Sequence, residues 1–178
     1  MILKIYQKQE QIQNKNNIIM CLFYPVEIAR NKDIVCYKIL KKINDDTYVS
    51  PFYPDKAKKW VLNKTKKLKS RPIPGFTYSF GNQDIIKIIE GNALHSCKTL
   101  LDAIHYSTVF LDSEDSSDYF IVKCVIPKSS VIYEGVTYTK NDWECSSYAS
   151  SQLKPVEIIS SINDIDLKTL YNSLVSRL

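Results

Sequence analysis

Both histidines of the chain lie in one short segment, GNALHSCKTLLDAIHYS, which also contains a cysteine. His95 and Cys97 are ligand types for zinc, but the chain has no CxxC and no HxxxH pair at ligand spacing. A thiol nucleophile is an alternative, because Cys97 precedes a predicted helix whose dipole could lower its pKa, with His95 or His105 as base. The spacings favour a structural role instead, with local hydrogen bonds for the histidines, and they predict no metal site.

Glycine and cysteine usage excludes two further kinds of site. The four glycines cannot form a GxGxxG or GxxxxGK[ST] motif, so no phosphate-binding loop is expected. The five cysteines are odd in number, widely spaced and mostly in apolar surroundings. We therefore expect reduced thiols that pack as small hydrophobes.

A basic segment from Lys56 to Arg71 has eight cationic residues and no acidic one, and it accounts for the net charge of +5. Its cations and its tryptophan could follow a phosphate backbone and stack on bases, or could bind a protein partner. The candidate binding residues are Lys58, Lys59, Trp60, Lys64, Lys66, Lys67, Lys69 and Arg71. The alternative is a solvated, lysine-rich edge that prevents aggregation.

The segments around these residues are mostly strand-like. The strand Asp33–Leu40 is expected to form a hairpin with Thr47–Ser50 across the turn at 44–46. The basic segment is ambiguous between helix and strand, and we favour a strand. Further extended segments are expected at IIKIIEGNAL (residues 85–94), YFIVKCVI (119–126), SSVIYEGVTYT (with a turn at Glu134-Gly135) and LKPVEII (153–159, where Pro155 indicates an edge strand or a strand start).

The sequence predicts two helices. Thr99 followed by Asp102 resembles a capping box, before Leu100, Leu101, Ala103 and Ile104 as the buried side. At the C-terminus Leu167, Leu170, Leu174 and Leu178 recur at helical spacing. The order of elements predicts an α+β fold, a single domain with a mostly antiparallel sheet and two or three helices.

The N-terminal residues 1–19 are polar and lack apolar periodicity, so they are expected to be an extension before a single domain at 20–178, and Met20 is an alternative start. No apolar stretch approaches the ~20 residues that cross a bilayer, and the N-terminus lacks the features of a signal peptide. We expect a cytoplasmic protein that does not insert into a membrane.

Five segments carry a resemblance to other proteins: MCLF (20–23), DIVCYKIL (33–40), the surroundings of HSCKTLLDAIHYS, YFIVKCVIPKSS (119–130) and YASSQLKPVEII (148–159). Together they resemble a family of uncharacterised small proteins from gut Bacteroides and their phages. The resemblance implies a phage or mobile-element setting.

A more distant similarity is to the ADP-ribosyltransferase fold, through Tyr37-Lys38, His95-Ser96 before a helix, and Glu157 on a late strand. It implies NAD as the cofactor, with Tyr37, Lys38 and Ser96 binding it and Tyr37, His95 and Glu157 as catalytic residues. Glu157 would stabilise an oxocarbenium-like ribose, and Tyr37 would stack on the nicotinamide. The alternative is that Glu157 is the solvent-facing residue of an edge strand.

Three functions therefore stand side by side. The first is a non-enzymatic interaction protein of a phage or mobile element that acts on a host factor. The second is an ADP-ribosyltransferase-like enzyme using NAD, and the third is a nucleic-acid-binding module centred on the basic segment. The enzyme requires Tyr37, Glu157 and either His95 or Ser96 to line one cleft, whereas an interaction protein requires an exposed apolar patch.

Overall fold

The structure is a computed structural model, and it describes residues 21–51, 59–78, 85–89, 92–111, 118–139 and 144–165. The polar extension at 1–19 and the C-terminal leucine repeat lie outside these residues. The described elements form one domain dominated by an antiparallel sheet. The only α-helix in this part of the chain is α2 (Leu100–Ser107), followed by the short 3-10 helix η1 (Thr108–Phe110). The strands are β1 (Leu22–Glu27), β2 (Ile34–Asn44), β3 (Thr47–Val49), β4 (Lys66–Lys67), β5 (Gly75–Tyr78), β6 (Ile85–Ile89), β7 (Leu94–Cys97), β8 (Tyr119–Ile126), β9 (Ile132–Tyr138), β10 (Glu144–Ser150) and β11 (Gln152–Ser161).

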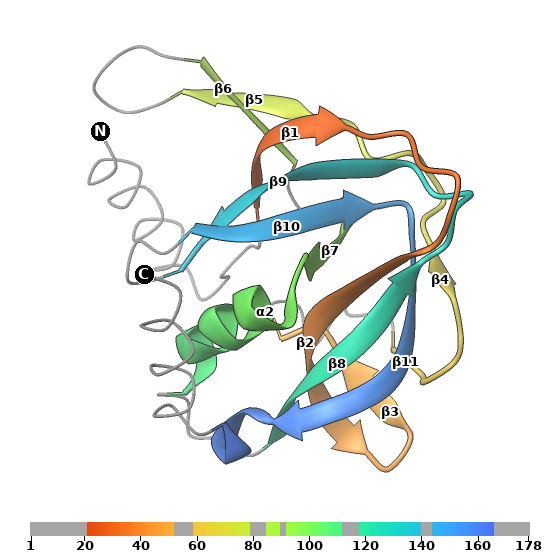
Figure 1. The fold of residues 1–178 in the computed structure, drawn as a ribbon, viewed down its shortest axis with the longest axis vertical. Helices are drawn as coiled ribbons and strands as arrows, with labels where there is room; N and C mark the ends of the chain where they lie inside the picture. The colour runs from red at the N-terminus through yellow and green to blue at the C-terminus, as the bar shows by residue number, and fades with distance from the viewer. Residues whose placement is uncertain are drawn as a thin grey trace.

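The strands join in the order β4-β11-β8-β2-β7-β10-β9-β1-β6-β5, with β3 paired to β2. Every pairing is antiparallel. Figure 1 shows the sheet strongly curved, with β9 and β10 on one side, β8 and β11 on the other, and α2 beside β7 and β2. The central strands therefore come from distant parts of the chain.

The described residues form four hydrophobic clusters, and the two largest, which we call the inner core and the helix core, lie on opposite faces of the sheet. The inner core draws buried residues from β2, β3, β7, β8, β9, β10 and β11, so the sheet must curl around it: Cys36, Leu40, Tyr48, Trp60, Leu94, Val122, Cys124, Ile126, Ile132, Tyr148 and Leu153. The helix core packs α2 and η1 on the other face: Ile39, Cys97, Ala103, Tyr106, Val109, Phe110, Tyr119, Ile121, Cys145 and Ile162. Residues that follow one another on a strand therefore enter different cores.

Helix α2 begins as its sequence predicts. Thr99 is the N-cap, and its hydroxyl accepts a hydrogen bond from the backbone N–H of Asp102. The Asp102 carboxylate accepts one in return from the backbone N–H of Thr99, which completes the capping box. The other oxygen of Asp102 accepts from the backbone N–H of Ser146 in β10, so the cap also fastens the helix to the sheet.

Several predicted elements are confirmed. The hairpin of β2 and β3 turns at Asp45 and Asp46, and β8 covers all of YFIVKCVI. LKPVEII lies in β11, where Pro155 is paired opposite Cys124 at a bulge and its carbonyl oxygen accepts a hydrogen bond from the backbone N–H of Asn63. The true edge beside β11 is the two-residue strand β4.

Three local predictions are wrong. Strand β9 runs straight through Glu134 and Gly135, where we expected a turn. A Cβ at Gly135 would lie 2.4 Å from the backbone oxygen of Phe23, so the glycine is there because β1 approaches closely. The segment 85–94 is two strands rather than one, and the described part of the basic segment, from Lys59 onward, contributes only Lys66–Lys67 and an isolated bridge at Trp60.

Candidate functional site

Tyr37 and Glu157 lie in one row across the face of the sheet that carries α2. Both are paired opposite Lys123 of β8, Tyr37 from β2 and Glu157 from β11. Two strand spacings therefore separate their backbones, about 10 Å. The nitrogen of Lys123 lies 3.1 Å from a carboxylate oxygen of Glu157, which is exposed. The alternation of β8 could have indicated that Lys123 shares this face, but the sequence alone did not show its partners.

The row continues into β7, where Cys97 is paired opposite Tyr37. His95 lies two residues before Cys97 on the same strand, so its side chain belongs to the same face. It is buried and is paired opposite Ala149. Cys97 packs with Ala103 and Tyr106, and Tyr37 packs against the same cluster. The three residues predicted to be catalytic thus share a face, but the helix packs onto it at Cys97 and Tyr37.

Lys38 and Ser96, predicted to bind a cofactor together with Tyr37, lie on the opposite face. Lys38 directly follows Tyr37 on β2, and Ser96 directly follows His95 on β7. Because adjacent side chains of a strand point to opposite faces, the side chains of Lys38 and Ser96 enter the inner core. The nitrogen of Lys38 donates a 2.7 Å hydrogen bond to the carbonyl oxygen of His95 and lies 5.5 Å from the centroid of the Trp60 ring. The sheet itself separates Lys38 and Ser96 from Tyr37 and Glu157, so the five residues do not form one pocket.

The surroundings of Lys38 disfavour its charged form. Burial lowers the pKa of its ammonium, against which the nearby thiols of Cys124, Cys97 and Cys36 act weakly in the other direction. Among the residues that the structure describes, no carboxylate forms an ion pair with Lys38. A lysine that is 7% exposed and has no counter-charge among the described residues is unusual in a protein interior.

The buried cysteines do not have the properties of nucleophiles. None of the five cysteines forms a disulfide, and all but Cys21 are buried. Burial raises the pKa of Cys97 well above its usual value, with the neighbouring Cys145 and Asp102 acting in the same direction. A cysteine nucleophile needs the opposite shift, so Cys97 beside the start of α2 is a packing residue. Across the described ranges, no group of three or more His, Cys, Asp or Glu residues could hold a metal ion.

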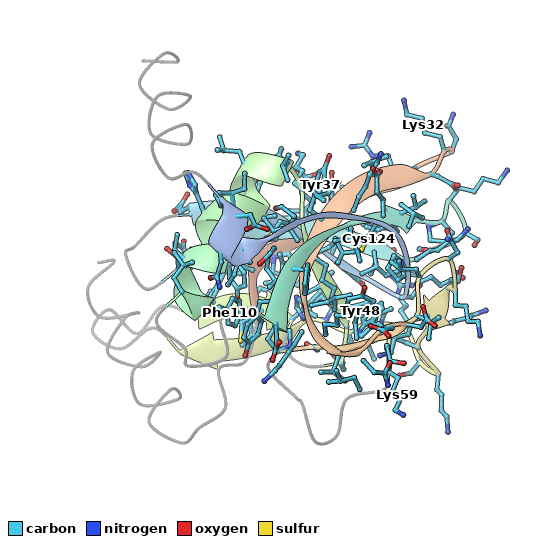
Figure 2. The ribbon with its side chains drawn as sticks, turned by 90° about the horizontal axis from the view of Figure 1, so that it is seen from below. Lys32, Tyr37, Tyr48, Lys59, Phe110 and Cys124 are labelled. Atoms are coloured by element: carbon cyan, nitrogen blue, oxygen red, sulfur yellow. The ribbon has the colours of Figure 1, made fainter. Side chains whose placement is uncertain are left out.

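The basic segment is only partly available for binding. Trp60 is 3% exposed, is hydrogen-bonded through its backbone to Tyr48, and has the Lys66 nitrogen 4.1 Å from its ring centroid, so it cannot stack on a base. Arg71 forms an ion pair with Glu27 and donates a hydrogen bond to the hydroxyl of Tyr133. Lys58 lies outside the described residues. The exposed cations of the segment are Lys59, Lys64, Lys67, Lys69 and Arg71. Figure 2 shows Lys59 at the periphery of the molecule, away from Cys124 in the interior.

An exposed apolar edge was missed by the sequence analysis. Phe76 on β5 is 72% exposed and is paired opposite the exposed Lys87 of β6, while the alternate residues Ile86 and Ile88 are buried. Ile73 just before β5 is 67% exposed. Strand β5 ends the sheet, and in the described part of the chain no strand pairs with its outer side. The alternation of IIKII could have indicated a strand with one polar position, but nothing local showed that β5 is terminal.

Comparison of the chain with protein-family models, with curated proteins and with solved structures finds no match in any of the three. No helix in the described residues has the length and apolar character needed to cross a membrane.

Proposed function

We propose that the chain is a non-enzymatic interaction protein that binds a host protein through the β5 edge of its sheet. The observation that carries this proposal is the exposure of Phe76 and Ile73 at a strand whose outer side has no partner in the described part of the chain. An unpaired edge strand offers backbone N–H and C=O groups to an extended segment of another protein. Large apolar side chains beside such an edge supply the contact area that backbone pairing lacks.

The chemistry of the edge favours an acidic partner. Neither Gly75–Tyr78 nor Ile85–Ile89 contains an acidic residue, and the exposed Lys87 lies directly opposite Phe76. Pro72 and Pro74 lack backbone N–H groups, so pairing is confined to β5 itself. We infer that the partner is a short extended segment with an apolar residue that covers Phe76 and an acidic residue near Lys87. A phage or mobile-element setting, implied by the resemblance described above, makes a host protein the expected partner.

The test uses a photo-crosslinking amino acid in place of Phe76 in host cells, followed by purified binding measurements with the protein that is captured. We expect a defined adduct from position 76 and at least an about tenfold loss of affinity in Phe76→Ser, because an aromatic anchor contributes ~2 kcal/mol or more. Ile43, 47% exposed in β2, is the matched control. An equal loss in Ile43→Ser, or none in Phe76→Ser, would contradict the edge as the binding surface.

Nucleic-acid binding is a second candidate, supported by the exposed lysines of the basic segment. Because Trp60 is buried, such binding would rest on phosphate contacts and would depend steeply on salt. Reversing the charge of Lys64, Lys67 and Lys69 should weaken a gel shift and flatten its salt dependence. Reversal of Arg30, Lys32 and Lys128, which are also exposed, is the control for net charge alone.

A further inference from the structure

The inner core contains hydrogen-bond donors that no described group satisfies. Lys38 has three N–H donors and uses one of them on the carbonyl oxygen of His95. The indole nitrogen of Trp60 and the hydroxyl of Ser96 are buried and have no hydrogen bond of standard geometry among the described residues, although the Ser96 hydroxyl lies near enough to the Cys36 thiol to oppose the rise in its pKa. Lys38, Trp60 and Ser96 are 7%, 3% and 0% exposed respectively. A buried polar group without a partner costs free energy, so two such groups beside a buried lysine with two unused donors require an explanation.

These donors lie around one region. The Lys38 nitrogen is 5.5 Å from the centroid of the Trp60 ring. The pairing of Tyr37 with Cys97 places Ser96 across from Lys38 on the next strand, on the same face. The surrounding inner core consists of buried residues such as Cys36, Cys124 and Leu94, which limits the region to a small occupant.

The donors indicate what that occupant is. An indole nitrogen only donates, an ammonium only donates, and a hydroxyl can donate. A water molecule could accept from two of these groups but would leave the ammonium without a counter-charge in a low-dielectric core. An anion accepts from all three and neutralises the charge.

We propose that Lys38, Ser96 and Trp60 form an interior binding site for one small anion, of the size of a halide or formate. Lys38 supplies the charge and a charge-assisted hydrogen bond, and the other two residues supply directional donors. Trp60 is held by one backbone bridge to Tyr48, and Lys66 lies against its ring. The indole therefore lies close to both the interior Lys38 and the half-buried Lys66, and the charge of Lys66 would attract an anion toward the site.

The tryptophan makes the site measurable. Iodide quenches indole fluorescence on contact, and the second tryptophan, Trp143, is removed by Trp143→Phe. Titration with iodide against gluconate, at constant ionic strength, should give saturable quenching of Trp60 that formate reverses by competition. In Lys38→Met we expect an apparent affinity at least about tenfold weaker, because a hydrogen bond to a charged group is lost. Ser96→Ala should weaken it less.

The control is Lys66→Met, which removes the other lysine against the same ring and should leave the saturable quenching in place. Quenching that is absent or rises linearly with iodide would overturn the proposal, since a buried indole without an anion site gives this result. Quenching lost in Lys66→Met but kept in Lys38→Met would also overturn it, because the anion would then bind at the surface. If Lys38→Met does not fold, judged by near-UV circular dichroism, Ser96→Ala takes its place. Weaker saturable quenching in Ser96→Ala would then support the interior site, and unchanged quenching would overturn it.

Discussion

The side-chain nitrogen of Lys38 donates a 2.7 Å hydrogen bond to the carbonyl oxygen of His95, inside a core where no described carboxylate faces it. Such a group is expected to lower the stability of the fold. Replacing it by an apolar side chain of similar length, Lys38→Met, should raise the free energy of unfolding by ~1–4 kcal/mol near pH 7. Denaturant unfolding of the two proteins measures this difference directly.

The pH dependence of that difference identifies its cause. The pKa of Lys38 is lowered from 10.5 in the folded state, so the unfolded chain holds this proton at pH values where the folded chain has lost it. The penalty is therefore complete below the folded pKa and disappears as the pH rises to 10.5. The advantage of Lys38→Met should shrink over this window, and a constant advantage would show that packing, not charge, explains it. The measured quantity is the difference in free energy of unfolding between Lys38→Met and the wild-type protein at each pH, because the buried thiols destabilise both proteins above pH 9.

The capping box of α2 gives a graded pair of mutations. Thr99→Ala removes the N-cap and should cost about 0.5–2 kcal/mol. Asp102→Ala keeps the bond from its own backbone N–H to Thr99, but it removes the carboxylate that accepts from the backbone N–H groups of Thr99 and Ser146, so it should cost more. Thermal unfolding of both variants tests the order, and a smaller loss in Asp102→Ala would contradict a stabilising role of the bond to Ser146.

Gly135 and Gly75 form a matched pair of glycines in strands. A Cβ at Gly135 would meet the Phe23 oxygen at 2.4 Å, whereas at Gly75 the nearest atom lies 4.0 Å away. Gly135→Ala should therefore destabilise the protein by about 1–3 kcal/mol by forcing β1 away from β9. Gly75→Ala should change stability by less than about 0.5 kcal/mol. Similar effects of both substitutions would refute the close approach of β1.

Thiol reactivity should distinguish one cysteine from the other four. Burial raises the pKa of Cys36 and of Cys145 to about 12, and those of Cys97 and Cys124 are raised well above the usual value. At pH 8 these thiols are protonated and enclosed, whereas Cys21 is half-buried. A thiol reagent should modify one group per chain rapidly and the rest only on unfolding. Rapid modification of a second group, mapped to Cys97, would reopen the nucleophile hypothesis.

The sequence could predict what is decided by neighbours along the chain. The Thr99 cap needs only Asp102 three residues later, and β8 is specified by its own apolar and β-branched residues until Pro127. Gly135 was taken for a turn because its actual role depends on Phe23, more than a hundred residues earlier. Long-range contacts of this kind leave no local pattern.

The distribution of the candidate site residues over the two faces of the sheet has a different cause. Tyr37 and Lys38 are adjacent on one strand, and strand alternation sends adjacent side chains to opposite faces. A predicted strand at Asp33–Leu40 was therefore enough to show that both could not bind one cofactor. Trp60, by contrast, stands among lysines, and only its bridge to Tyr48 and its contact with Lys38 place it in the core.

The strand order also has a consequence for how the chain folds. Strand β2 lies near the centre of the sheet and pairs with β8 from Ile34 to Lys41. The other edge of β8 pairs with β11, the last strand described. The loops that these pairings close are long, so their entropy must be lost before most of the contacts form. Folding is thus expected to be slow, because the contact order is high. During synthesis, a nascent chain that has not yet released β8 and β11 from the ribosome can complete neither core.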